Sequence, residues 1–201
     1  MPLSYLNDQL TTMKPLLIGA LVAVLAFVPA RFAVAQNASP AVVLEPQKLV
    51  IEVEVPAPLS EVWRAFSTSD GLITWLAPAG VVDLRPGGEW TVRFPGGNST
   101  GGGTIISFVP EKQIVIAALA PDQFPHVRAE RTRALFEFQA HGNSTIVRLT
   151  QTGWKEGAEW TRAYEYLLAG NAQLMSALHR RFVEGPIDWK KAFGDSATKG
   201  Q

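Results

Sequence analysis

A change of hydrophobic period at Gly157 constrains the fold of this chain more than any other sequence feature. Before Gly157, short segments alternate apolar and polar residues, which is the pattern of strands with one buried face. After it, apolar residues recur at steps of three and four as far as Gly185-Pro186, which predicts one amphipathic helix of about 25 residues. Strands followed by a single long helix predict an α+β domain, with the helix on one face of a curved antiparallel sheet.

Six segments carry the strand pattern, and two short helical segments follow the first of them. The strand segments are residues 48–55, 89–94, 103–110, 113–120, 132–140 and 144–151. The helical segments are residues 59–67, which we expect Ser60 to cap, and residues 69–77, which end before Pro78. Because most connections between the strands are short, neighbouring strands are expected to pair as an antiparallel meander.

The first 35 residues have the organisation of a secretory signal peptide. Lys14 precedes an uncharged apolar stretch of 13 residues, and Ala33-Val34-Ala35 is the small-x-small pattern that a signal peptidase recognises. The stretch is shorter than the roughly 20 residues that span a bilayer. We therefore expect cleavage after Ala35 and a secreted or periplasmic protein without stable membrane insertion. An uncleaved N-terminal anchor is the alternative.

This interpretation divides the chain into four parts. Residues 1–35 are the signal peptide, and residues 36–46 are a flexible lead-in rich in small residues and proline. Residues 47–190 are the folded domain, and residues 191–201 are a disordered tail. No internal repeat divides the folded part.

The composition excludes several classes of protein and site. Eighteen basic and eighteen acidic residues balance to a formal charge of zero, so nothing favours binding to nucleic acid. The absence of cysteine excludes a disulfide scaffold, a thiolate zinc site and a cysteine nucleophile. His126, His141 and His179 do not stand at metal-ligand spacing, and no Ser–His–Asp arrangement is visible. We expect no metal, no cofactor and no catalytic residue.

A glycine-rich stretch, residues 96–103, raises the question of a phosphate-binding loop. Such a loop needs a Lys after its last glycine and a helix behind it, but here no Lys follows and a strand pattern begins. The stretch is therefore predicted to be the turn of a hairpin, in which glycines supply positive φ angles. A mobile flap at the mouth of a pocket is the alternative.

The inward faces of the sheet and of the long helix suggest a ligand cavity. Tyr164 and Asn171 are polar positions on an otherwise apolar helix face, which is easier to explain if the space beside them is partly open. The basic stretch from Arg128 to Arg133 is expected on the outer face, or alternatively as an anion site at the cavity entrance. Glu137 is expected to face outward. The candidate ligand-binding residues are Trp75, Trp90, Phe94, Phe136, Phe138, Trp160, Tyr164, Leu168, Asn171 and Met175.

Two segments resemble the SRPBCC superfamily, in particular the subgroup similar to the activator of the heat-shock-protein-90 ATPase. They are VPAPLSEVWRAFSTSDGLITWLAP, residues 55–78, and TGWKEGAEWTRAYEYLLAGNAQLMSALHRRFVEGPIDW, residues 152–189. The resemblance covers residues 48–189 and implies a helix-grip fold, a curved antiparallel sheet around a long C-terminal helix. It also implies binding of apolar molecules such as lipids, sterols or polyketides. A minority of such proteins catalyse cyclisation or dehydration, and the superfamily has no shared catalytic signature.

Three functional hypotheses follow. The first is an exported, non-catalytic binding protein for a small apolar ligand held between the sheet and the long helix. The second is an enzyme of the cyclase or dehydratase type, with Tyr164 and His126 as proton donors. The third is a protein-interaction module whose pocket is filled by its own side chains. Contact with the cytosolic chaperone is not expected, because an exported protein would not meet it.

Overall fold

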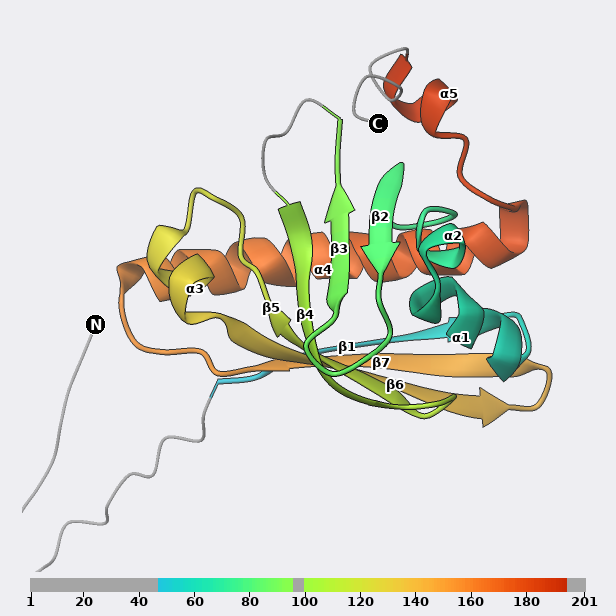
Figure 1. The fold of residues 1–201 in the computed structure, drawn as a ribbon, viewed down its shortest axis with the longest axis horizontal. Coiled ribbons are helices and arrows are strands. Elements are labelled where there is room, and N and C mark those ends of the chain that lie inside the picture. The colour runs from blue at the N-terminus through green and yellow to red at the C-terminus, as the bar shows by residue number, and fades with distance from the viewer. Residues whose placement is uncertain (1–46, 96–99, 195–201) are drawn as a thin grey trace, which may run out of the picture. The chain divides into compact units, whose positions relative to one another are not determined.

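In the part of the chain that the structure describes, seven strands form one antiparallel sheet that curves around a long helix (Figure 1). The structure, a computed structural model, describes residues 47–95 and 100–194. The strand order is β1-β7-β6-β5-β4-β3-β2. The strands are β1 (Leu49–Val55), β2 (Ala79–Val82), β3 (Glu89–Arg93), β4 (Thr100–Val109), β5 (Gln113–Ala118), β6 (Thr132–His141) and β7 (Ser144–Thr152).

The helices lie at both ends of the sheet and along its concave side (Figure 1). The long helix α4 follows β7, and β2, β3 and β4 cross it while β1, β6 and β7 run along it. The α+β helix-grip architecture predicted from the sequence is confirmed. In the described residues the helices are α1 (Leu59–Ser67), α2 (Ser69–Leu72), α3 (Pro125–Glu130), α4 (Ala158–Glu184) and α5 (Trp189–Phe193).

Both ends of α4 coincide with glycines in positive-φ conformations. Gly157 precedes the first helical residue with a φ of 126°, and Gly185 follows the last with a φ of 98°. Both angles lie in the range that residues with a side chain rarely adopt. The change of period at Gly157 and the Gly185-Pro186 pair therefore predicted the two ends of the helix correctly.

Two hydrophobic clusters anchor the elements. The larger one packs α1 and the α2 region against the sheet around Phe66, whose ring lies 4.8 Å from that of Trp75 and 5.2 Å from that of Phe136. The smaller one packs α3 and the start of α4 around Trp154 and Trp160, with ring centroids 6.5 Å apart. The larger cluster thus fixes α1 and the α2 region to the sheet, and the smaller cluster fixes α3 to the start of α4.

Three short elements differ from the sequence predictions. α1 begins after Pro58, with no side chain capping it, so Ser60 lies inside the helix and is not its cap. β2 is too short to show an alternating pattern, and it forms as an edge strand paired with β3. Residues 125–130, which lie outside the predicted strands and helices, form α3, and Glu159 Oε1 accepts hydrogen bonds from the N–H groups of His126 and Val127 at the start of this helix.

The glycine-rich stretch joins two strands, β3 and β4, that pair as an antiparallel hairpin as predicted, but its second half belongs to a strand and not to the turn. Gly101, Gly102 and Gly103 belong to β4 and pair with β3, while residues 96–99 lie outside the described residues. Gly102 has a φ of +88°, and a Cβ there would lie 2.1 Å from the carbonyl oxygen of Trp90. Gly102 and Gly103 are needed because the backbones of neighbouring strands approach them closely, so these two glycines are parts of the sheet and not of a loop.

The C-terminal end of the domain extends past residue 190, where a disordered tail was expected to begin. α5 continues to Phe193, because the Asp188 side chain accepts a hydrogen bond from Lys191 N, and the Trp189 ring stacks on that of Phe193. The predicted signal peptide and lead-in, and the rest of the predicted tail, lie outside the described residues. In the described ranges no helix is both long and apolar enough to cross a membrane.

Candidate functional site

A cavity of about 400 Å³ lies between the inner face of the sheet and α4. Its walls come from β3 to β7, the segment after α2, the segment after β5 and the middle of α4. Phe94 and Tyr166 are 39% and 50% exposed, so they mark the side on which the cavity meets solvent. The lining residues include Leu76, Val92, Ile116, Ala118, Leu119, Pro121, Ala134, Leu149, Leu167 and Leu174.

Six of the ten candidate residues predicted from the sequence line this cavity. They are Trp75, Trp90, Phe94, Phe136, Asn171 and Met175. They come from four separate stretches of the chain, which the fold brings together around one space. Trp90, Phe136, Asn171 and Met175 lie on the faces on which strand and helix parity placed them, whereas Trp75 follows α2 and Phe94 follows β3.

The structure places the other four candidates outside the cavity. Phe138 faces the same side as Phe136 but lies farther along β6, where its ring packs 5.4 Å from that of Trp63. Trp160 belongs to the smaller hydrophobic cluster, and Tyr164 packs against it. The Tyr164 hydroxyl donates to the carbonyl oxygen of Lys48 at 3.3 Å. Leu168 is 40% exposed. A position on the inward face is thus not sufficient for a residue to line the cavity, because the cavity is lined by only part of each element.

Two tryptophans form a fixed aromatic wall. The Trp75 Nε1–H donates to the carbonyl oxygen of Ala65 at 2.9 Å, and the Trp90 Nε1–H donates to that of Phe66 at 2.8 Å. Both acceptors belong to the last turn of α1, whose carbonyl groups have no partner within the helix. The two indole groups therefore complete the end of α1, and this holds both rings in place beside the cavity.

Three polar side chains form a hydrogen-bonded chain that begins at the cavity wall. Asn171 Nδ2 donates to Gln151 Oε1 at 3.0 Å, and Gln151 Nε2 donates to Thr132 Oγ1 at 2.7 Å. Gln151 and Thr132 are 3% and 4% exposed. Sequence reasoning selected Asn171 but missed its two partners. A signal was present, because Gln151 has the same strand parity as Val147 and Leu149 and is polar on an inward face.

Gly170 lines the cavity from the middle of α4. Among the described residues, no atom outside the helix's own nearby backbone lies within 4 Å of the position that a Cβ at Gly170 would occupy. A glycine inside a helix costs about 1 kcal/mol relative to alanine. Packing therefore does not require a glycine at position 170, and the missing side chain leaves space beside the cavity.

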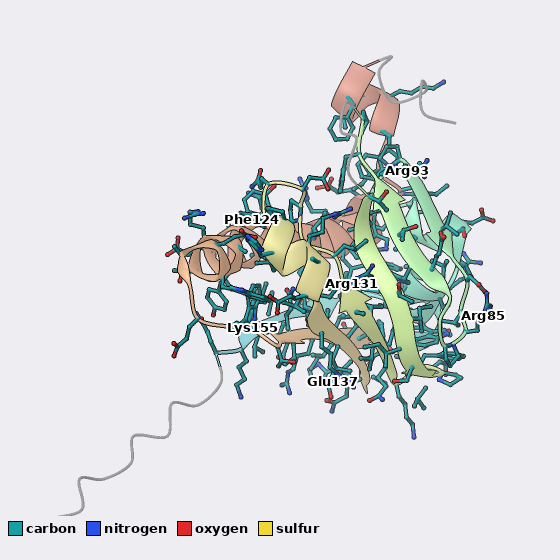
Figure 2. All side chains as sticks on the ribbon, turned by 60° about the vertical axis from the view of Figure 1, so that its left-hand side comes forward. Arg85, Arg93, Phe124, Arg131, Glu137 and Lys155 are labelled. Carbon is teal, nitrogen blue, oxygen red and sulfur yellow. The ribbon has the colours of Figure 1, made fainter. Side chains whose placement is uncertain are left out.

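None of the described residues that line the cavity carries a charge. Arg128 pairs with Asp122 at 3.0 Å and donates to two backbone carbonyl groups, and Arg131 donates to Thr104 Oγ1. Arg131 lies where α3 meets the sheet, whereas Glu137 points away on the outer side, as expected (Figure 2). The alternative that the basic stretch forms an anion site at the entrance therefore lacks a free arginine at the cavity wall.

The proton donors of the enzyme hypothesis do not reach the cavity either. The Tyr164 side chain lies outside the cavity lining, and the His126 side chain is 79% exposed and 4.0 Å from a Glu159 carboxylate oxygen. Tyr166 carries the titratable group among the described lining residues. In the described ranges, no group of three or more His, Cys, Asp or Glu residues is arranged to hold a metal ion.

Comparison with known proteins gives a family and a fold. A sequence model described as "Activator of Hsp90 ATPase homolog 1-like protein" matches residues 56–180. Among solved structures, protein MLL2253 from Mesorhizobium loti is 18% identical, with 70% of this chain and 100% of that chain covered and a TM-score of 0.59. Among curated proteins, none matches this sequence.

Two further solved structures share the fold. The Aha1 dimer from Colwellia psychrerythraea is 20% identical, with 69% of this chain and 98% of that chain covered and a TM-score of 0.53. CalU16 from Micromonospora echinospora is 20% identical, with 76% and 84% covered and a TM-score of 0.51. At these identities the likeness is one of fold.

Proposed function

Because this chain belongs to the Activator of Hsp90 ATPase homolog 1-like protein family, whose fold can enclose a cavity, we propose that it binds a small apolar ligand there. The bound ligand would lie between the aromatic wall and α4. The volume of about 400 Å³ falls within the range of about 300–1,000 Å³ that is usual for small-molecule sites. Mostly apolar walls with a few placed polar groups are also typical of such sites.

Gly170 is the observation that carries this proposal. A core that only needs to be packed gains from a larger side chain at an open helical position, because burial of apolar surface and helix propensity act in the same direction. Here the open space is retained beside a polar chain and an aromatic wall. A ligand that fills this space gives a reason for the glycine, whereas an interaction module with a closed core does not.

Export is part of the same proposal. Lys14, the apolar stretch after it and Ala33-Val34-Ala35 support a cleaved signal peptide and a mature protein that begins at Gln36. In this proposal the protein acts outside the cytoplasm as a carrier or receptor of an apolar compound.

The test is binding of N-phenyl-1-naphthylamine, a neutral dye whose fluorescence rises in apolar surroundings. We expect saturable binding of one dye per chain. Gly170→Phe, which places a ring in the open space, should weaken binding by about ten-fold or more while the protein stays folded. Ala172→Phe is the matched control, because Ala172 is exposed on α4 and does not line the cavity.

Two results would contradict the proposal. If the dye does not bind the parent protein, the cavity is not a ligand site, and the interaction-module hypothesis replaces it. If both phenylalanine variants weaken binding equally, the dye binds elsewhere on the surface.

A further inference from the structure

Among the described residues, the buried polar side chain that lines the cavity is that of Gln151, and it is uncharged. Thr100, Tyr166 and Gln173 also line the cavity, but none of the three is buried. Gln151, which lines the cavity, is buried and is joined by hydrogen bonds to Thr132, which is also buried, and to Asn171, which is half-buried. A ligand that enters the cavity therefore meets one connected chain of polar side chains, and the walls around the rest of its surface are mostly apolar.

The end of this polar chain can serve as an acceptor. Asn171 Nδ2 is used by Gln151, while no described residue hydrogen-bonds Asn171 Oδ1. A ligand hydroxyl or N–H group can donate to this oxygen. Such a bond would complete a chain of three hydrogen bonds that ends at Thr132 Oγ1.

The same chain can also run in the opposite direction. The oxygen and nitrogen atoms of an amide exchange places when the group rotates by 180°, and a hydroxyl group both donates and accepts. If both amides rotate, Thr132 O–H donates to Gln151 Oε1, and Gln151 Nε2 donates to Asn171 Oδ1. Asn171 Nδ2 is then free to donate to a ligand carbonyl group, and the heavy atoms stay in the same positions.

An anionic head group finds no cation among the described residues of the cavity wall. Burial of a carboxylate without a cation or several donors is strongly unfavourable. Arg128 and Arg131 already donate to Asp122, to Thr104 and to backbone carbonyl groups, and neither lines the cavity. The cavity wall therefore offers hydrogen bonds to neutral groups and no compensation for a negative charge.

We propose that the cavity selects a neutral apolar molecule with one hydroxyl or carbonyl group, which hydrogen-bonds to Asn171, and that it discriminates against carboxylates. This inference rests on the proposed function and deepens it, because it names the chemical class of the ligand. It applies to the intact protein and requires no conformational change beyond rotation of two amides.

Competition against N-phenyl-1-naphthylamine tests the inference with four compounds of one skeleton: naphthalene, 2-naphthol, 2-acetylnaphthalene and 2-naphthoate. We expect 2-naphthol and 2-acetylnaphthalene to bind about 2- to 13-fold more tightly than naphthalene, the factor that corresponds to one neutral hydrogen bond. At neutral pH, 2-naphthoate should bind about ten-fold or more weakly than 2-acetylnaphthalene.

Asn171→Leu should remove the advantage of 2-naphthol and 2-acetylnaphthalene and leave naphthalene bound nearly as before. Asn143→Leu is the matched control, because Asn143 lies in the exposed turn after β6 and should change none of the four affinities. If 2-naphthoate binds as tightly as 2-acetylnaphthalene, or if naphthalene matches both neutral compounds, this inference is overturned while dye binding still supports a ligand cavity. If the dye itself does not bind, both proposals fail.

Discussion

Gly170→Ala is predicted to raise the free energy of unfolding, whereas most core substitutions lower it. Gly170→Ala adds one methyl group at a position where no described atom outside the local helix backbone lies within 4 Å. Alanine is favoured over glycine in a helix interior by about 0.8–1.0 kcal/mol. Because no packing cost opposes this gain, the free energy of unfolding should rise by about 0.5–1 kcal/mol.

The magnitude is measurable in a domain of this size. For proteins of 150–250 residues, a change of 1 kcal/mol shifts the melting temperature by about 2–4 °C. Urea denaturation followed by tryptophan fluorescence gives the free energy, and calorimetry gives the melting temperature. Dye affinity should stay within about two-fold of the parent value, because a methyl group occupies little of the space that a phenyl ring would fill.

Gly103→Ala is the matched comparison, since it makes the same chemical change in the same domain. There the added Cβ would lie 2.1 Å from the carbonyl oxygen of Ala117, a backbone atom held in the sheet. Overpacking of this kind costs typically about 1–3 kcal/mol. If Gly170→Ala destabilises the protein as Gly103→Ala does, the space beside Gly170 is not open, and the main support for a ligand cavity is lost.

Trp90→Ala should lower the free energy of unfolding by about 3–5 kcal/mol, because it removes a buried ring and leaves the Phe66 carbonyl group without its donor. Chemical denaturation measures this free energy, and a loss below about 1 kcal/mol would contradict the aromatic wall formed by Trp75 and Trp90. Glu159→Ala should increase amide hydrogen exchange in α3 and lower the free energy of unfolding by about 1 kcal/mol, because two N–H groups lose their acceptor. Unchanged exchange in α3 would count against this contact. N-terminal sequencing of the exported protein should start immediately after Ala35, and an intact Met1 in the soluble fraction would refute export by a cleaved signal peptide.

Some of the candidate site could be predicted from the sequence, and the limit has a physical cause. Strand and helix periods assign a residue to a face, so Trp90 and Phe136 were correctly expected to point inward. The periods do not say how far along an element a residue meets open space. Phe138 and Trp160 share the inward face, but they are covered by α1 and by the smaller cluster.

The sequence by itself determined the class of fold. Alternating segments, the period change at Gly157 and the Gly185-Pro186 ending are local patterns, which indicate the type of each element without information on which elements pack together. Tertiary structure decided the polar chain and the role of the glycines. Gln151 meets Asn171 across 20 positions of sequence, and Gly103 faces the Ala117 backbone, only because β7, α4, β4 and β5 pack together. Such contacts depend on the distances between elements, and no period in the sequence encodes those distances.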